Sequence, residues 1–165
     1  MKEIFERTSV RSYMTKRVED EKIQALLKAA MAAPSAGNQQ PWEFYVVKNK
    51  ETIQSLAKVS PYAGCAAKAP VVLVPCYRSR DLLFPEYAQI DLSIACENIL
   101  LEAVSQNLGA VWLGIAPIRE RMEKTAEVLN LPDHLKAFAL LPVGYPAKQE
   151  KPQNRFDLER IHVIV

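Results

Sequence analysis

The chain has 165 residues, of which 49% are hydrophobic and 24% charged, and its formal net charge is +2. This length can enclose one hydrophobic core, and the composition is ordinary for a globular protein, so we expect a single domain over residues 1–165. The basic residues are scattered, without a run of Lys or Arg. A general affinity for nucleic acid or for an anionic membrane is therefore not expected.

The first seven residues are too charged for a secretory signal, and no apolar stretch approaches the length of a membrane span. Cys65, Cys76 and Cys96 are widely spaced and lie in apolar surroundings, which is typical of reduced, buried thiols. With only two histidines and no CxxC pair, a metal site is not expected. We therefore expect a cytoplasmic protein without a metal centre.

The first part of the chain predicts helices and one strand. Apolar residues recur at helical spacing over residues 19–33, with Asp20 as a plausible N-cap and Pro34 as the stop. Residues 43–48 are rich in strand-forming side chains. Shorter helices are predicted at residues 2–6 and 51–59.

The middle of the chain predicts a buried strand and the longest helix. Val71–Val74 forms an apolar run whose limits we expect at Pro70 and Pro75. Residues 85–107 are apolar on nearly all sides of a helix, as in a helix buried centrally or at a subunit interface. Gly109 is the expected C-cap of this helix.

The last third predicts a strand at 110–115, a helix at 118–129 after Pro117, a strand at 136–143, a loop at 148–154 and a final strand at 161–165. Helices and strands mix without strict βαβ alternation. This order favours an α+β domain with a mixed or antiparallel central sheet flanked by helices.

Two segments carry polar groups suited to a ligand. Arg7, Thr8, Ser9 and Arg11 offer two guanidinium groups and two hydroxyls, which suit a phosphate, although a solvated charged surface is the alternative. Arg155 would add a third guanidinium if it lay close by. The segment Pro34–Trp42 forms a rigid turn with amides aimed outward, or only a helix-to-strand loop.

The sequence offers little for side-chain catalysis. It contains no GxGxxG and no phosphate loop, and the end of the strand at Gly114 would instead let the backbone approach a flat ligand, or simply be a core strand. Asp91 and Glu97 are best interpreted as a solvated stripe or an internal hydrogen bond. If the protein is an enzyme, we expect a cofactor to carry the reaction.

Five segments together resemble the FMN-dependent nitroreductase family in its short form. In chain order they are Arg7–Tyr13, Pro34–Phe44, Asn107–Trp112, Leu141–Pro146 and Arg155 after Lys151 and Pro152. The resemblance covers nearly the whole chain. It implies a nitroreductase-like α+β fold and an intertwined homodimer with two FMN sites at the subunit interface.

The resemblance also implies roles for particular residues. Arg7, Ser9 and Arg155 would hold the FMN phosphate and ribityl chain, and Arg11 would reach either the phosphate or the pyrimidine edge. Thr8 would lie beside them. In the turn, Pro34, Ser35 and Asn38 would reach the ring from the other subunit, and Gln40 is also implied to bind the cofactor. Gly114, Ile115 and Ala116 would contact the ring through their backbone.

The function implied is the transfer of a hydride from NADH or NADPH through FMN to a small flat acceptor, such as a quinone or nitroaromatic, with ping-pong kinetics. Alternatives are dehalogenation or dehydrogenation on the same scaffold, a non-catalytic flavin-binding dimer, and a dimeric structural domain without a cofactor. Thr8 stands where the family often has Arg, and Lys68 is only a weak counterpart of a lysine that some members place near the flavin.

Overall fold

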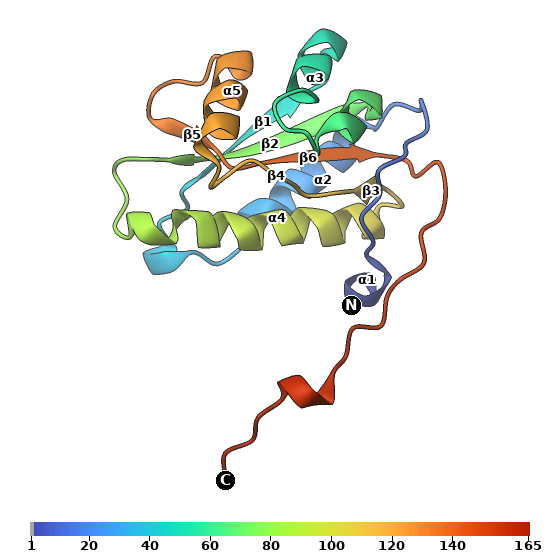
Figure 1. Ribbon diagram of the computed structural model, residues 1–165, viewed down its shortest axis with the longest axis vertical. Helices are drawn as coiled ribbons and strands as arrows, with labels where there is room; N and C mark the ends of the chain where they lie inside the picture. The colour runs from blue at the N-terminus through green and yellow to red at the C-terminus, as the bar shows by residue number, and fades with distance from the viewer. Residues whose placement is uncertain (1) are drawn as a thin grey trace.

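The computed structural model describes residues 2–165 and shows a six-stranded sheet with helices on both faces (Figure 1). The main strand order is β1-β2-β6-β3, while β5 pairs with β2 and β4 pairs with β6. All pairings between these strands are antiparallel. The strands are β1 (Trp42–Val47), β2 (Val71–Arg78), β3 (Gly109–Ala110), β4 (Leu113–Gly114), β5 (Leu135–Ala137) and β6 (Ala139–Gly144).

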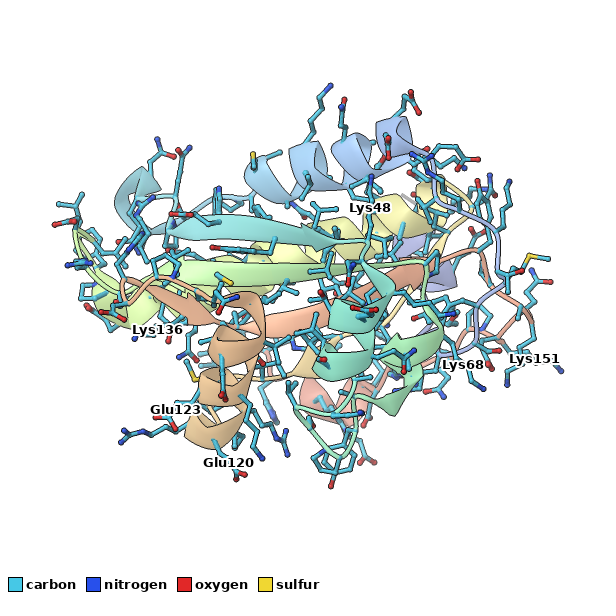
Figure 2. All side chains as sticks on the ribbon, turned by 90° about the horizontal axis from the view of Figure 1, so that it is seen from above. Lys48, Lys68, Glu120, Glu123, Lys136 and Lys151 are labelled. Atoms are coloured by element: carbon cyan, nitrogen blue, oxygen red, sulfur yellow. The ribbon has the colours of Figure 1, made fainter. Side chains whose placement is uncertain are left out.

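The helices form a layer on each side of the sheet (Figure 2). On one side, α2 (Asp20–Met31) packs against α4 (Ala88–Ser105), and the short α1 (Glu3–Glu6) lies against α4. On the other side are α3 (Lys50–Leu56) and α5 (Arg119–Leu129), with Glu120 and Glu123 pointing outward from α5. Short 3-10 turns lie at Ala36–Asn38, Gly64–Lys68, Pro85–Tyr87 and Leu158–Arg160.

The two-residue period of β2 divides the core between these layers. Val71 and Leu73 pack into the core shared with α2 and α4, whereas Val72, Val74 and Cys76 pack into the core under α3 and α5. Alternate side chains of a strand point to opposite faces, so a strand covered on both sides must be apolar throughout. The run Val71–Val74 reflects this double burial, and the α+β prediction with an antiparallel sheet is confirmed.

One predicted strand boundary was wrong because tertiary contacts override local preference. Pro75 lies inside β2, opposite Phe44, and does not end the strand. The partner of β2 changes from β6 to β5 at this point, where the Phe138 N–H donates to the Pro75 carbonyl at 2.9 Å. Because the ladder is already interrupted at Phe138, the missing N–H of proline leaves no regular sheet bond unmade.

Two helix caps also differ from the prediction. Asp20 is the first residue of α2, and Glu19 is its N-cap without a side-chain bond. The Asp20 carboxylate instead binds Arg17 and Lys48. At the end of α4, Asn107 takes the left-handed conformation expected of Gly109 (φ 58°), and the Leu108 N–H returns to the Ala103 carbonyl at 2.7 Å.

The expected strands at 110–115 and 136–143 are each divided in two, as β3 with β4 and β5 with β6. The expected strand at 161–165 does not form. These residues lie in a tail that leaves the body of the molecule (Figure 1), and Val163 and Ile164 are 77% and 98% exposed. A strand needs a partner edge, and the tail reaches none within the described chain.

Candidate functional site

The N-terminal segment and the C-terminal tail enclose a cavity of about 1080 Å³. Arg7, Thr8, Ser9 and Arg11 line it from the N-terminal segment, and Arg155 lines it from the tail. The three arginines that were predicted as a group therefore do lie around one cavity. Lys148 and Lys151 also line it, and both were missed because the sequence analysis treated their segment only as a polar loop.

Backbone pairing holds the N-terminal segment against β3 and against the start of the tail. Ser9 forms a bridge with Ala110, and the Val10 N–H donates to the Ala110 carbonyl at 3.0 Å. Farther along, the Ala147 N–H donates to the Ser12 carbonyl at 2.9 Å, which leads the tail past the N-terminal segment. A Cβ on Gly109 would lie 2.6 to 2.8 Å from the Val10 side chain, so glycine permits this close approach.

Tyr13 fixes the base of the same segment. Its hydroxyl donates to the Val10 carbonyl at 2.6 Å and contacts the Pro142 carbonyl at 3.2 Å. Burial raises the pKa of the Tyr13 phenol well above its usual value, so the hydroxyl keeps its proton and remains a donor. The segment that carries the arginines is thus held rigidly against β3 and β6.

The cavity has an excess of positive charge. Glu97 of α4 pairs with Arg7, with 3.5 Å between Oε1 and Nε, and Glu150 pairs with Lys148 at 2.8 Å. The Arg155 guanidinium donates only to the neutral Gln153 side chain, at 2.9 and 3.2 Å. Within residues 2–165 no carboxylate forms an ion pair with Arg11 or Arg155, so both charges are available to an anion.

The predicted turn lies elsewhere and is held in an uncommon conformation. Gly37, Asn38 and Gln40 have φ angles of 56°, 53° and 45°. The Ser35 hydroxyl oxygen accepts the Gln40 N–H at 3.0 Å, and Asn38 Oδ1 accepts the Gln40 amide at 3.3 Å. None of the predicted residues Pro34, Ser35, Asn38 and Gln40 lines the cavity of this chain.

The predicted backbone site at the end of β4 also lies outside that cavity. Gly114 is exposed, and a Cβ built on it would meet nothing within 4 Å, whereas Ile115 is fully buried. The Ala116 N–H donates to the Phe138 carbonyl at 2.9 Å and is therefore already bonded within the sheet region. Arg121 of α5 donates to the Gly114 carbonyl at 3.1 Å, a contact that nothing in the sequence pattern indicated.

Lys68 is exposed at the end of the 3-10 turn Gly64–Lys68 and does not line the cavity. Figure 2 shows it toward the same end of the molecule as Lys151. Cys65, in the same turn, has a thiol whose pKa is raised by burial, against the opposing effect of the Arg11 charge. No helix within residues 2–165 combines the length and apolar character that crossing a lipid bilayer requires.

Comparison with known proteins identifies the family of the chain. A sequence model described as the Nitroreductase family matches residues 4–64 and 60–145. The chain belongs to the nitroreductase family. A Methanothermobacter thermautotrophicus relative, assigned as an NADH dehydrogenase/NAD(P)H nitroreductase, is 40% identical over 157 residues, which cover 95% of this chain and 82% of that protein.

Solved structures of nitroreductase-like proteins share the fold. A Clostridium acetobutylicum protein assigned as an NADH oxidase superimposes with a TM-score of 0.95 at 46% identity, covering 98% of each chain. A Desulfovibrio desulfuricans nitroreductase, solved in complex with FMN, has a TM-score of 0.84 at 28% identity, covering 99% of this chain and 95% of that one. The expected nitroreductase-like fold is therefore confirmed.

Proposed function

We propose that this nitroreductase-family chain is an NAD(P)H-dependent oxidoreductase that binds FMN and reduces small flat acceptors, such as quinones or nitroaromatics. The observation that carries the proposal is the cavity that Arg7, Arg11 and Arg155 line together with three hydroxyl side chains, those of Thr8, Ser9 and Ser12. The FMN-bound Desulfovibrio relative supports the choice of cofactor, and the naming of the Methanothermobacter relative supports the choice of electron donor.

The cavity suits the phosphate end of FMN in charge and in donor type. A phosphate monoester brings nearly two negative charges and several acceptor oxygens, which match guanidinium groups and hydroxyls. Arg11 and Arg155 have no carboxylate partner within residues 2–165, so binding an anion would break no ion pair at either residue. Arg7, Ser9 and Arg155 would hold the phosphate and the ribityl chain, with Thr8 and Arg11 beside them.

The remaining predicted residues would position the ring. Gly114, Ile115 and Ala116 would present backbone at one edge of the isoalloxazine, and the exposed, open position of Gly114 leaves room for it. Pro34, Ser35, Asn38 and Gln40 would reach the ring from a second subunit. Bound FMN would supply the capacity to take a hydride from NADH or NADPH and to return electrons to the acceptor.

A homodimer follows from the same proposal. The turn residues do not line the cavity of their own chain, which fits the inference that they complete the site of a second subunit. Ile90 and Ile94 of α4 are apolar but 55% and 37% exposed. The tail carries further exposed apolar residues, and a second copy of the chain is the occupant that would cover both. The exposed residues of the tail are Phe156, Leu158, Ile161, Val163, Ile164 and Val165.

We also propose that the protein acts in the cytoplasm, because its three cysteines are free thiols. The enzymatic proposal is tested by steady-state oxidation of NADH and NADPH with menadione or nitrofurazone as acceptor. Parallel lines in double-reciprocal plots are expected for a ping-pong enzyme. Flavin binding without turnover would instead indicate a flavin-binding protein, and selective turnover of halogenated phenols would indicate dehalogenation.

A further inference from the structure

The turn between α2 and β1 is held by one buried carboxylate. Asp91, in the first turn of α4, is 3% exposed. It accepts the Ala36 N–H on Oδ1 at 2.9 Å and the Gln39 side-chain amide on Oδ2 at 2.7 Å. No cation pairs with it among the described residues, so its charge is balanced by these N–H donors and by the positive end of the helix dipole.

The backbone of Phe84 determines which atom of the Gln39 amide donates to Asp91. Gln39 also accepts the Phe84 N–H on Oε1 at 3.0 Å and donates from Nε2 to the Phe84 carbonyl at 2.9 Å. The backbone of Phe84 therefore decides which end of the Gln39 amide faces Asp91. Residue 91 must present two acceptors at once, one to Ala36 and one to Gln39, which a carboxylate can do and an amide cannot.

The contact holds a conformation that the turn does not favour by itself. Asn38 and Gln40 both have positive φ, and the Phe84 ring covers Gly37 so closely that a Cβ there would lie 2.8 Å from it. Non-glycine residues keep such angles only where surrounding structure imposes them. Asp91 and Gln39 join the turn to the start of α4 and to Phe84, and these supply that constraint.

The fixed turn presents donors outward. The oxygens of Ser35 and Asn38 accept bonds from Gln40 inside the turn, which leaves the Ser35 hydroxyl hydrogen and the Asn38 Nδ2 group to donate elsewhere. Asn38 is exposed and Ser35 is half-buried. An isoalloxazine ring edge offers mainly acceptor oxygens and nitrogens, so donors placed this way suit it.

We propose that Asp91 is a positioning residue for the flavin ring: it holds the Ser35–Gln40 turn so that Ser35 and Asn38 donate to the ring of the neighbouring site. This inference rests on the proposed function. Asp91 does not touch the phosphate cavity, so it acts on the ring end of the cofactor and not on its anchoring.

The test is the variant Asp91→Asn, which keeps the size of the side chain but forces a donor against either Ala36 or Gln39. We expect FMN to remain bound, with an affinity about tenfold lower because the contacts of Ser35 and Asn38 with the ring are weakened. The visible spectrum and midpoint potential of the bound flavin should shift, and kcat should fall while KM for NAD(P)H changes little. Asp133→Asn, an exposed carboxylate between α5 and β5, is the matched control and should change none of these.

A rescue experiment separates positioning from general damage. In the double variant Asp91→Asn with Gln39→Glu, the new amide at position 91 can donate to the new carboxylate at position 39. That carboxylate still accepts the Phe84 N–H but no longer donates to the Phe84 carbonyl. We therefore expect the double variant to recover part of the lost kcat and of the flavin spectrum. If Asp91→Asn does not fold, Gln39→Met should produce the same spectral shift from the turn side.

Two results would overturn the inference. The first is a wild-type flavin spectrum, potential and kcat in Asp91→Asn, or in Gln39→Met where that variant replaces it. The second is a loss of activity without any change in the spectrum or midpoint potential of the bound flavin. The proposed function is tested separately, by measuring whether the wild-type protein retains FMN. If it retains none, the proposed function fails, and this inference fails with it.

Discussion

Arg7 and Glu97 form an ion pair between the N-terminal segment and α4, with 3.5 Å between Arg7 Nε and Glu97 Oε1. The Arg7 side chain is only 20% exposed, whereas that of Glu97 is 49% exposed. The pair engages one edge of the guanidinium group and leaves its terminal nitrogens for a ligand in the cavity. Glu97, which the sequence predicted only as a solvated or internally bonded residue, therefore orients a predicted phosphate-binding residue.

The first prediction concerns the anchoring of FMN. Arg7→Ala and Arg155→Ala should each raise the dissociation constant for FMN by about 10- to 100-fold, since a hydrogen bond to a charged group contributes about 1.5 to 3 kcal/mol. The free energy of unfolding of the flavin-free protein should fall by about 1 kcal/mol or less, because partly exposed ion pairs stabilise little. Fluorescence titration with FMN and urea unfolding measure the two effects.

The control for these variants is Arg119→Ala. Arg119 pairs with Glu123 on α5, its side chain is 90% exposed, and it is not among the residues predicted to contact FMN. This variant should bind FMN as tightly as wild type. Full FMN occupancy in both Arg7→Ala and Arg155→Ala would contradict the phosphate assignment.

The second prediction separates two glycines by their surroundings. Gly109→Ala should destabilise the fold by about 1 to 3 kcal/mol, because its Cβ would overlap the Val10 side chain. Gly114→Ala should change stability by less than about 0.5 kcal/mol, because its Cβ would meet nothing within 4 Å. Only Gly114→Ala should weaken FMN binding in the folded protein. Equal effects on stability, or no effect of Gly114→Ala on FMN binding, would count against this assignment.

The third prediction concerns the cysteines. Burial raises the pKa of the Cys76 thiol to about 12 and raises that of Cys96 further, while Cys65 is only partly buried and its pKa is raised less. A raised pKa lowers the thiolate fraction at every pH below it, and the thiolate is the reactive form. Iodoacetamide at pH 8 should therefore modify Cys65 first in the native protein, at a rate that rises with pH. Mass spectrometry identifies the site, and rapid native labelling of Cys76 or Cys96 would be inconsistent with their burial.

The fourth prediction concerns assembly. The double variant Ile90→Glu with Ile94→Glu places two charges on the exposed apolar surface of α4 and should yield a monomer by light scattering. The monomer should also lose FMN, because the proposed site needs the turn of a second subunit. Tyr62→Glu changes an even more exposed apolar residue, 74% accessible, on the opposite side of the sheet, and this variant should remain a dimer. A dimeric, flavin-bound α4 variant would refute the proposed interface.

Much of the fold could be predicted because local signals and tertiary structure agree. The apolar period of α2, with Ile23, Leu26 and Ala30 buried, reflects one buried face of the helix, and the apolar run in β2 reflects burial on both faces of the sheet. The motif order along the chain then indicated the family. The apolar patterns and the motifs each lie within short stretches of sequence.

The features that could not be predicted depend on residues far apart in the chain. Pro75 is tolerated inside β2 because the strand partner changes at Phe138. Asn107 takes the left-handed conformation after α4, whereas Gly109 is needed where Val10 approaches. Asp91 looked like one more polar position on a helix, because its partners Ala36 and Gln39 precede it by some fifty residues. Residues 161–165 have the composition of a strand, but strand formation requires a partner edge, which residues 2–160 do not provide.

The most direct test of the proposed function is the visible absorption spectrum of the purified wild-type protein, recorded after adding excess FMN and removing the unbound part. Our proposal predicts a retained flavin spectrum that corresponds to about one FMN per subunit, as a specific site at each cavity requires. A folded protein that retains no flavin would contradict the proposal, and Arg7, Arg11 and Arg155 would then be ordinary surface charges.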